Sequence, residues 1–253
     1  FGALWALIPA WLQAKRGSHI VITTIMFNFI AASVMVYMLV DVIKPPGSMA
    51  PQTRLFLEGA QLPRLNWLIE MFGLGRIRSA PFNISFILAL AMAWLVWLLI
   101  WRTRLGYEMR TYGFSPKAAR YAGISETRII IVAMMISGAL AGMMALNPTM
   151  GDQHNVALDF VSGAGFVGIA VALMGRSHPV GIILAALLFG MLYQGGAELS
   201  FEMPNISRDM IVIIQGLVIL FAGALEHMFR PAIQTLFASF SPRSVGMTEG
   251  KGA

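Results

Sequence analysis

The stretch Ile129-Ile-Ile-Val-Ala-Met-Met-Ile-Ser-Gly138-Ala-Leu-Ala-Gly142-Met-Met-Ala-Leu146 decides the class of fold, because it contains no charged side chain. As an α-helix it would be about 27 Å long, close to the roughly 30 Å hydrocarbon core of a bilayer. Similar uncharged runs occur at Ile20–Val40, Phe82–Trp101, Pro179–Tyr193 and Met210–Leu225. The chain is 57% hydrophobic and only 12% charged, whereas soluble domains are about 25% charged. We therefore predict an all-α, polytopic membrane helix bundle.

Two further apolar segments fit this bundle less simply. Phe1–Leu12 is too short to span a bilayer and lacks the basic leader and small-residue cleavage site of a signal peptide, so we interpret it as the end of a helix that is cut by N-terminal truncation. The Gly-rich stretch Phe160–Gly175 is marginal in length, and it is either a full span or a re-entrant helix. We predict a membrane domain over residues 1–230 and a cytoplasmic tail over 231–253.

Basic residues are distributed unevenly between the two predicted sides. Twelve of the eighteen fall in segments that we place inside: Lys15, Arg16, Arg102, Arg104, Arg110, Lys117, Arg120, Arg128, Arg176, Arg230, Arg243 and Lys251. The segment Asn147–Asp159 has none, and five others are spread over the long segment Asp41–Ala80. Because cytoplasmic loops carry the excess of Lys and Arg, we place Arg102–Arg128 and the C-terminus in the cytoplasm, and we place Asn147–Asp159 and the long segment Asp41–Ala80 outside. Topology thus explains the net charge of +6 better than nucleic-acid binding does.

The loop before Ile129 carries a second signal, Thr111-Tyr-Gly-Phe-Ser-Pro-Lys-Ala-Ala-Arg-Tyr-Ala-Gly-Ile-Ser125. Ser115 is a helix N-cap residue, Pro116 suits the first helical position, and Gly123 lies where such a helix would stop. Small residues lie between them: Ala118, Ala119 and Ala122. We predict about two turns of helix on which another protein docks, although an ordinary basic loop is the alternative.

Glycines and one amide mark helix contacts inside the bundle. Gly138 and Gly142 lie four residues apart on one helix face, so they let a second helix approach closely. Asn28 is the lone amide of the first full span and serves either helix packing or a solute path. Residues that we assign to the solute path are Asn28, Gly163, Gly165, Phe166 and Gly168.

Catalytic and metal-binding patterns are weak in this sequence. There is no cysteine, and the four histidines are scattered without metal-ligand spacing. Asp152, His154 and Asp159 lie close together but lack a nucleophile or a further ligand, so solvated loop residues are the better interpretation. We expect neither an enzyme nor a metal site. Because the five spans carry no ionisable group, an ion-coupled secondary transporter is less favoured. A transporter driven by a partner could do without such groups, and so could a channel subunit, which stays an alternative.

Several motifs together resemble the permease subunits of bacterial ABC importers for nucleosides and simple sugars, in the larger family that also serves ribose and branched-chain amino acids. The matching stretches are Thr103–Tyr107 with Arg110, Gly113–Ile124, Ser137–Gly142, Gly165–Arg176, His178–Gly181 and Ala185–Gly190. Val21–Asn28 and Pro45–Gly47 favour the nucleoside type over the ribose type. The Gly-rich N-terminal third of that family does not appear in this sequence, so no pore residue is assigned there.

This resemblance implies the fold of a type II ABC importer permease in a bacterial inner membrane. It also implies a second permease subunit in a homo- or heterodimer, ATPase subunits that hydrolyse the ATP, and an extracytoplasmic binding protein or lipoprotein. The chain itself would bind no cofactor, and the exact substrate is not specified. The inside loop would be the helix that couples to the ATPase, through Gly113, Ser115, Pro116, Lys117, Ala118, Ala119, Arg120, Tyr121 and Gly123.

Overall fold

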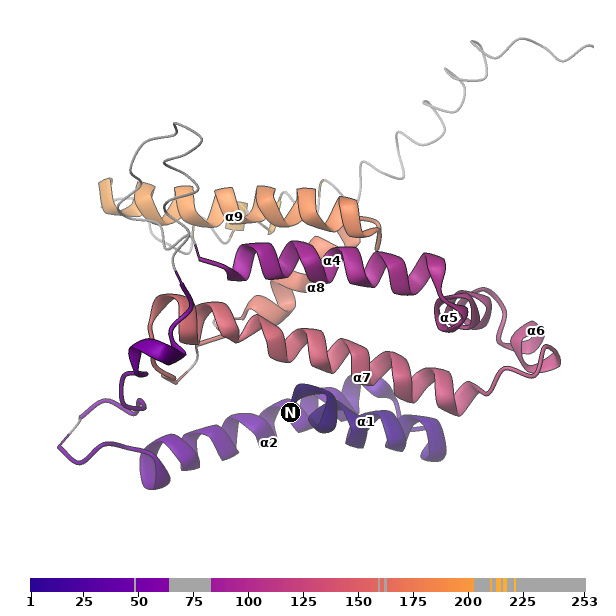
Figure 1. Cartoon of the computed structure of the whole chain (residues 1–253), viewed down its shortest axis with the longest axis horizontal. Coiled ribbons are helices and arrows are strands. Elements are labelled where there is room, and N and C mark those ends of the chain that lie inside the picture. Colours follow the sequence, from indigo (N-terminus) through magenta and orange to yellow (C-terminus); the bar gives the residue numbers. More distant parts are fainter. Residues whose placement is uncertain are drawn as a thin grey trace, which may run out of the picture. The chain divides into compact units, whose positions relative to one another are not determined.

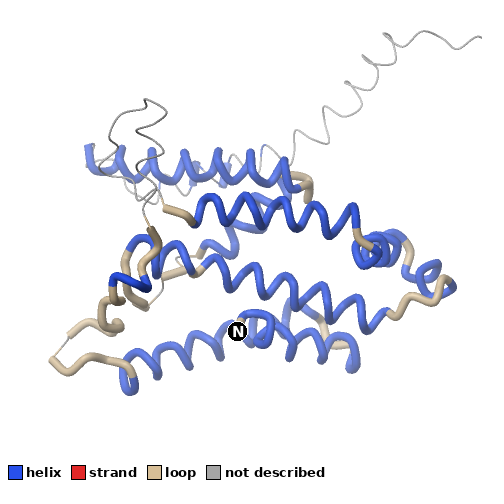
Figure 2. Tube along the Cα trace, in the orientation of Figure 1, coloured by secondary structure: helices blue, strands red, loops and turns tan. Residues whose placement is uncertain are grey.

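A computed structural model describes residues 1–47, 49–63, 83–158, 160–161 and 163–202, together with single positions between 210 and 221. Each regular element within these ranges is helical, and an isolated bridge between Gln52 and Ala157 is the β contact found there (Figure 2). The prediction of an all-α protein is therefore confirmed for the described part of the chain.

The chain divides into two compact units, residues 1–168 and 169–253, and each is described by itself. The first unit contains α1 (Gly2–Arg16), α2 (Ile20–Tyr37), α4 (Ser85–Arg102), α5 (Arg104–Phe114), α6 (Pro116–Tyr121) and α7 (Glu126–Met144) (Figure 1). It also contains a 3-10 turn, η2 (Glu58–Ala60), and two π-helical turns, η1 (Met38–Val42) and η3 (Asn147–Asp152). Helix α8 (Ala164–Met174) crosses the boundary, and α9 (Pro179–Glu202) belongs to the second unit.

Within the described residues, four helical segments are long and apolar enough to cross a membrane: Ile20–Val42, Ser85–Arg102, Glu126–Asp152 and Pro179–Gly196. They coincide with four of the five predicted spans to within a few residues, so the chain is a multi-pass membrane protein. The fifth predicted span, the tail over 231–253 and the location of the C-terminus lie outside the described residues, apart from single helical positions in Met210–Leu225.

Two helices are longer than the sequence predicts. The helical path of α7 continues through η3 into a segment that we expected to be an outer loop, since the amide of Thr149 donates to the carbonyl of Ala145 (3.1 Å). Pro148 is tolerated because it occupies the first turn of η3, where a backbone N–H is not required. Helix α9 runs to Glu202 instead of ending near Tyr193.

Helix α8 has 11 residues and is therefore about 16 Å long, too short to cross a bilayer as one continuous helix. A compact turn follows it, in which Arg176 and Ser177 both have positive φ (54°). A Cβ added at Gly175 would lie 2.5 Å from the amide nitrogen of Ile182, so glycine is required for this close approach.

The most extensive helix contact among the described elements is that between α1 and α7. A Cβ added at Gly138 would lie 2.5 Å from the Cβ of Ala6 and 2.6 Å from the carbonyl oxygen of Gly2. One turn later, a Cβ at Gly142 would lie 3.4 Å from the Cα of Gly2. The two glycines therefore face α1, and the approach is much closer at Gly138.

Helices α4 and α7 run in opposite directions, and their ends are capped by different structures (Figure 1). At one end, the segment 53–62 pairs with 150–156 through backbone hydrogen bonds such as Phe56 N–H to the His154 carbonyl (2.8 Å). At the other end lie α5 and α6. Both segments that we predicted to be outside thus meet at one end, opposite the predicted inside loop.

Candidate functional site

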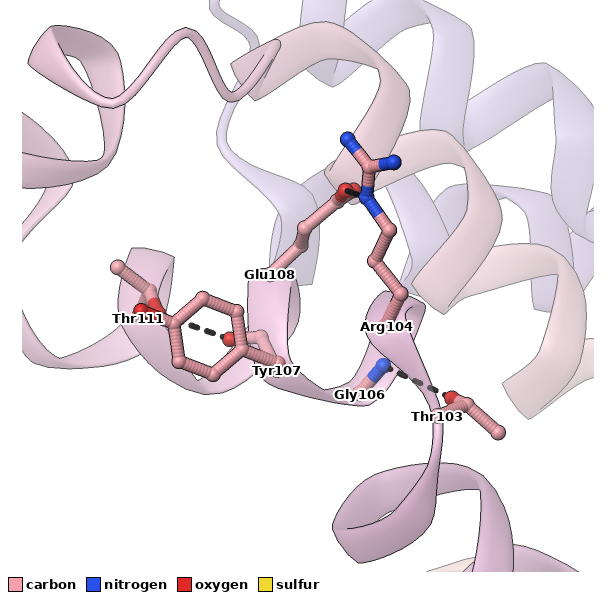
Figure 3. Close-up of polar contacts among 6 residues, drawn as sticks. All are labelled: Thr103, Arg104, Gly106, Tyr107, Glu108 and Thr111. Carbon is pink, nitrogen blue, oxygen red and sulfur yellow. Dashed lines mark hydrogen bonds and ion pairs between the residues drawn. The ribbon is translucent and has the colours of Figure 1, made fainter.

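The predicted inside loop contains a helix, α5, that the sequence analysis missed. Its N-cap is Thr103, whose Oγ1 accepts a hydrogen bond from the Gly106 amide (3.1 Å), and an ion pair of 3.1 Å joins Arg104 to Glu108 (Figure 3). The Thr111 hydroxyl donates to the Tyr107 carbonyl one turn later (2.9 Å). A capping threonine and oppositely charged residues four apart are the local signals that could have identified it.

Gly106 allows α5 to begin immediately after α4. It is buried, and a Cβ there would overlap the carbonyl oxygens of Leu99 and Ile100 in the last turn of α4. The chain can therefore turn sharply at this point only because residue 106 has no side chain.

The helix predicted from Ser115-Pro116 is present as α6. The Oγ of Ser115 accepts a hydrogen bond from the amide of Ala118 (3.3 Å), and Pro116 occupies the first turn. At the other end, the amide of Gly123 donates to Arg120 (3.1 Å) and that of Ile124 to Ala119 (3.0 Å). These two bonds, with a φ of 75° at Gly123, form a Schellman motif.

Large apolar side chains are exposed where α5 and α6 end. Phe114 and Tyr121 are almost fully exposed, at 91% and 95% of their maximal accessible surface. The residues of α6 that are exposed beside them are Pro116, Lys117, Ala118 and Arg120. A surface that combines aromatic rings with small residues outside the membrane spans is typical of a protein contact.

Ala119 departs from the prediction. We expected it at the closest approach to a partner protein, but it is completely buried within this chain. Its side of α6 faces inward because α6 packs against α5 and α7. Ala119 therefore supports the position of α6, and the outward-facing small residue is Ala118.

A shared carboxylate joins the three helices of this region. The Tyr112 hydroxyl on α5 donates to Glu126 Oε1 (2.7 Å), and Nη2 of Arg120 on α6 donates to Glu126 Oε2 (2.9 Å). The hydrogen bond to this carboxylate raises the pKa of Tyr112 above its ordinary value. Because Glu126 is the first residue of α7, the two contacts hold α5 and α6 against the start of that helix.

A cavity of about 680 Å³ lies between α4 and the end of α7 with η3. Asn83, Ser85 and Asn147 line its polar part, and methionines contribute to its apolar wall. None of the predicted path residues Asn28, Gly163, Gly165, Phe166 and Gly168 lines it. Asn28 is exposed on α2, and a Cβ at any of the three glycines would meet nothing within 4 Å in the described structure. Their path role therefore stays a prediction.

Comparison with known proteins gives the family. Residues 1–223 match the family described as the branched-chain amino acid transport system/permease component. This chain belongs to that family. No solved structure shows a significant match to it.

The relatives of this permease-family chain include transporters of different solutes. It is 33% identical to the glucose ABC transporter permease protein of Haloferax volcanii over 93% of this chain and 62% of the relative. It is 32% identical to a nucleoside ABC transporter permease protein of Lactococcus lactis subsp. cremoris, over 97% and 67%. It is 34% identical to a guanosine ABC transporter permease protein of Bacillus subtilis, over 88% and 62%. The chain thus spans about two thirds of the length of these relatives.

Proposed function

We propose that this permease-family chain is the membrane-spanning subunit of an ATP-driven importer for nucleosides or simple sugars in a bacterial inner membrane, and that α6 docks the ATPase. The relatives are named as glucose, nucleoside and guanosine permeases. The partners of such a subunit are ATPase subunits, a second permease subunit and an extracytoplasmic binding protein or lipoprotein. The solute path then lies in this chain, and ATP is hydrolysed by its partner.

The observation that carries the docking role is the exposed surface of α5 and α6. Aromatic residues dominate the binding energy of many protein interfaces. Here the exposed Phe114 ends α5, and the exposed Tyr121 ends α6, which is capped at both ends. A preformed helix loses little conformational entropy on binding. The surface is therefore suited to insertion into a groove of the ATPase.

The carboxylate of Glu126 supplies the mechanical link. It binds Tyr112 of α5 and Arg120 of α6 while belonging to α7, so a displacement of α6 by the ATPase also moves the start of α7. The opposite end of α7 borders the cavity. One helix thus connects the docking surface with the solute path, as a coupled transporter requires.

An ion-coupled carrier agrees less well with the described residues. Carriers of that class use ionisable groups near the middle of the membrane. Among the residues that the structure describes, the lining of the cavity between α4 and α7 contains no Asp, Glu, Lys, Arg or His. The energy for transport therefore fits a partner subunit better.

Copurification of the ATPase with the tagged chain tests the docking role. We expect Tyr121→Ala and Ala118→Trp to lower the amount of bound ATPase at least severalfold, since the first removes an aromatic anchor and the second adds bulk at an outward-facing position. Lys117→Ala should cause a smaller loss, because an exposed ion pair contributes at most about 1 kcal/mol.

The matched control is Leu57→Ala, which truncates an apolar side chain of 85% exposure at the opposite end of the structure. It should bind the ATPase as the unmodified chain does. Normal ATPase binding by both Tyr121→Ala and Ala118→Trp, with normal membrane insertion, would show that α6 is not the docking element.

A further inference from the structure

Two asparagines far apart in the sequence meet at the polar part of the cavity. Nδ2 of Asn83, a residue that is 1% exposed, donates to Oδ1 of Asn147 (3.1 Å). The hydroxyl of Ser85 lies 2.9 Å from the same oxygen and also contacts Oδ1 of Asn83. A side-chain cluster that joins the start of α4 to η3 is thus present at one end of the cavity.

In this cluster the acceptor oxygens are occupied, whereas some N–H donors are not. Both amide oxygens already accept hydrogen bonds, including one from the Ser85 amide to Asn83 (3.2 Å). The Nδ2 group of Asn147 carries two N–H donors, and no hydrogen bond from it is found among the described residues, although Asn147 lines the cavity. The cluster therefore offers donors, and it suits a ligand with acceptor oxygen or nitrogen atoms.

The rest of the wall is apolar and adaptable. Met92 of α4 and Met143 and Met144 of α7 contribute to it, and unbranched thioether side chains adjust to ligands of different shape. The volume of about 680 Å³ lies within the range of small-molecule sites, about 300–1,000 Å³. The cavity is thus large enough for one sugar or nucleoside with water.

A separate backbone feature supports a functional role for this cluster. Asn147 begins the π-helical turn η3, and such turns are rare and frequent at functional sites. A Cβ added at Gly151 in the same turn would overlap Nδ2 of Asn83. The π turn and its glycine therefore bring backbone against the buried amide of Asn83, which in turn donates to Oδ1 of Asn147.

We propose that this cavity binds the transported solute and that the solute is an uncharged polar molecule, a nucleoside or a sugar, whose acceptor atoms bind the amide of Asn147. This inference rests on the importer function proposed above. A zwitterionic amino acid would place a carboxylate and an ammonium in a cavity whose described lining residues are all uncharged, and burying unpaired charge is strongly unfavourable. The site therefore selects against amino acids although the family description names them.

Uptake by the assembled transporter in proteoliposomes tests the role of Asn147, with guanosine, glucose and leucine as probes. Asn147→Ala removes the donors and should raise KM for guanosine or glucose about three- to tenfold, the effect of one lost hydrogen bond. Asn155→Ala, eight residues further along the chain and outside the lining, is the matched control and should leave KM unchanged.

Alkylation of an introduced cysteine measures solute binding without transport. The introduced thiol is the single one present, because the chain has no cysteine of its own. Guanosine or glucose should slow the reaction of Met143→Cys with a maleimide, whereas leucine should not. Met26→Cys, exposed on α2, is the control, and no solute should protect it.

The outcomes separate the two proposals. Protection of Met143→Cys without ATP-driven uptake would reject the importer function and retain the site. Uptake of guanosine or glucose with an unchanged KM in Asn147→Ala and no protection would reject the site and retain the importer. Protection by leucine would refute the selection for uncharged solutes, and absence of both uptake and protection would overturn both proposals.

Discussion

Replacing Gly138 by alanine should destabilise the protein, whereas the same change at Gly142 should not. Carbon atoms in contact are separated by about 3.5–4.0 Å, but a Cβ at position 138 would lie 2.5 Å from the Cβ of Ala6. Helices α1 and α7 would have to separate by about 1 Å, and overpacking of this kind costs about 1–3 kcal/mol. At Gly142 the nearest atom would be 3.4 Å away, so there is room for the methyl group, and alanine gains up to about 1 kcal/mol in helix propensity.

The measurement is the midpoint temperature of thermal unfolding of the purified transporter in detergent. Loss of the monodisperse peak in size-exclusion chromatography after heating reports the unfolded fraction. Gly138→Ala should lower the midpoint, and Gly142→Ala should leave it unchanged or raise it. Adding Ala6→Gly to Gly138→Ala should restore part of the loss, since it removes one of the two overlapping atoms, while the Gly2 carbonyl stays at 2.6 Å. Equal effects of the two alanine variants, or no rescue by Ala6→Gly, would refute this packing.

Three further predictions concern the region of α5 and α6. Gly106→Ala should prevent folding of the loop or lower the yield of membrane-inserted protein, because its Cβ would overlap the backbone of α4; normal yield would refute the sharp turn. Lys117→Cys should react with an impermeant maleimide only from the cytoplasmic side, and labelling from outside intact cells would invert the topology. The hydrogen bond to Glu126 raises the pKa of Tyr112 above 10.0, so its stabilising contribution is complete below pH 10 and is lost as pH rises through the raised value. In an absorbance titration, a late component should disappear in Tyr112→Phe and shift to lower pH in Glu126→Gln.

Local signals predicted the parts of this structure that depend on neighbouring residues. The uncharged runs give the four spans, because length and polarity alone decide whether a helix fits a bilayer. The caps of α6 were predictable because Ser115 and Gly123 act on backbone groups within a few residues. Helix α5 was missed because its residues form no apolar run. Its cap depends on Thr103, which directly follows the preceding span, and on the amide of Gly106 in its first turn.

Long-range contacts account for what the sequence did not predict. The burial of Ala119 depends on the packing of α6 against α5 and α7. The cavity was missed because Asn83 and Asn147 are 64 residues apart. Asn83 lies at the start of one apolar run and Asn147 directly follows another, so in the sequence both look like ordinary residues at the end of a span. The two amides come together only in the folded chain.

The π-helical turn η3 sets which residues after Leu146 face Asn83 and which pair with the segment 53–62. Successive residues of an α-helix are rotated by about 100°, so a π turn accommodates one more residue than an α turn before the chain resumes its direction. Deleting one residue between Asn147 and Gly151 would convert this turn to ordinary α-helical pairing. Gly151 would then no longer lie against Asn83, and the segment 150–156 would be offset by one residue from its partners in 53–62. Substitutions in this segment would therefore be tolerated more readily than single-residue insertions or deletions, which alter every contact beyond the point of change.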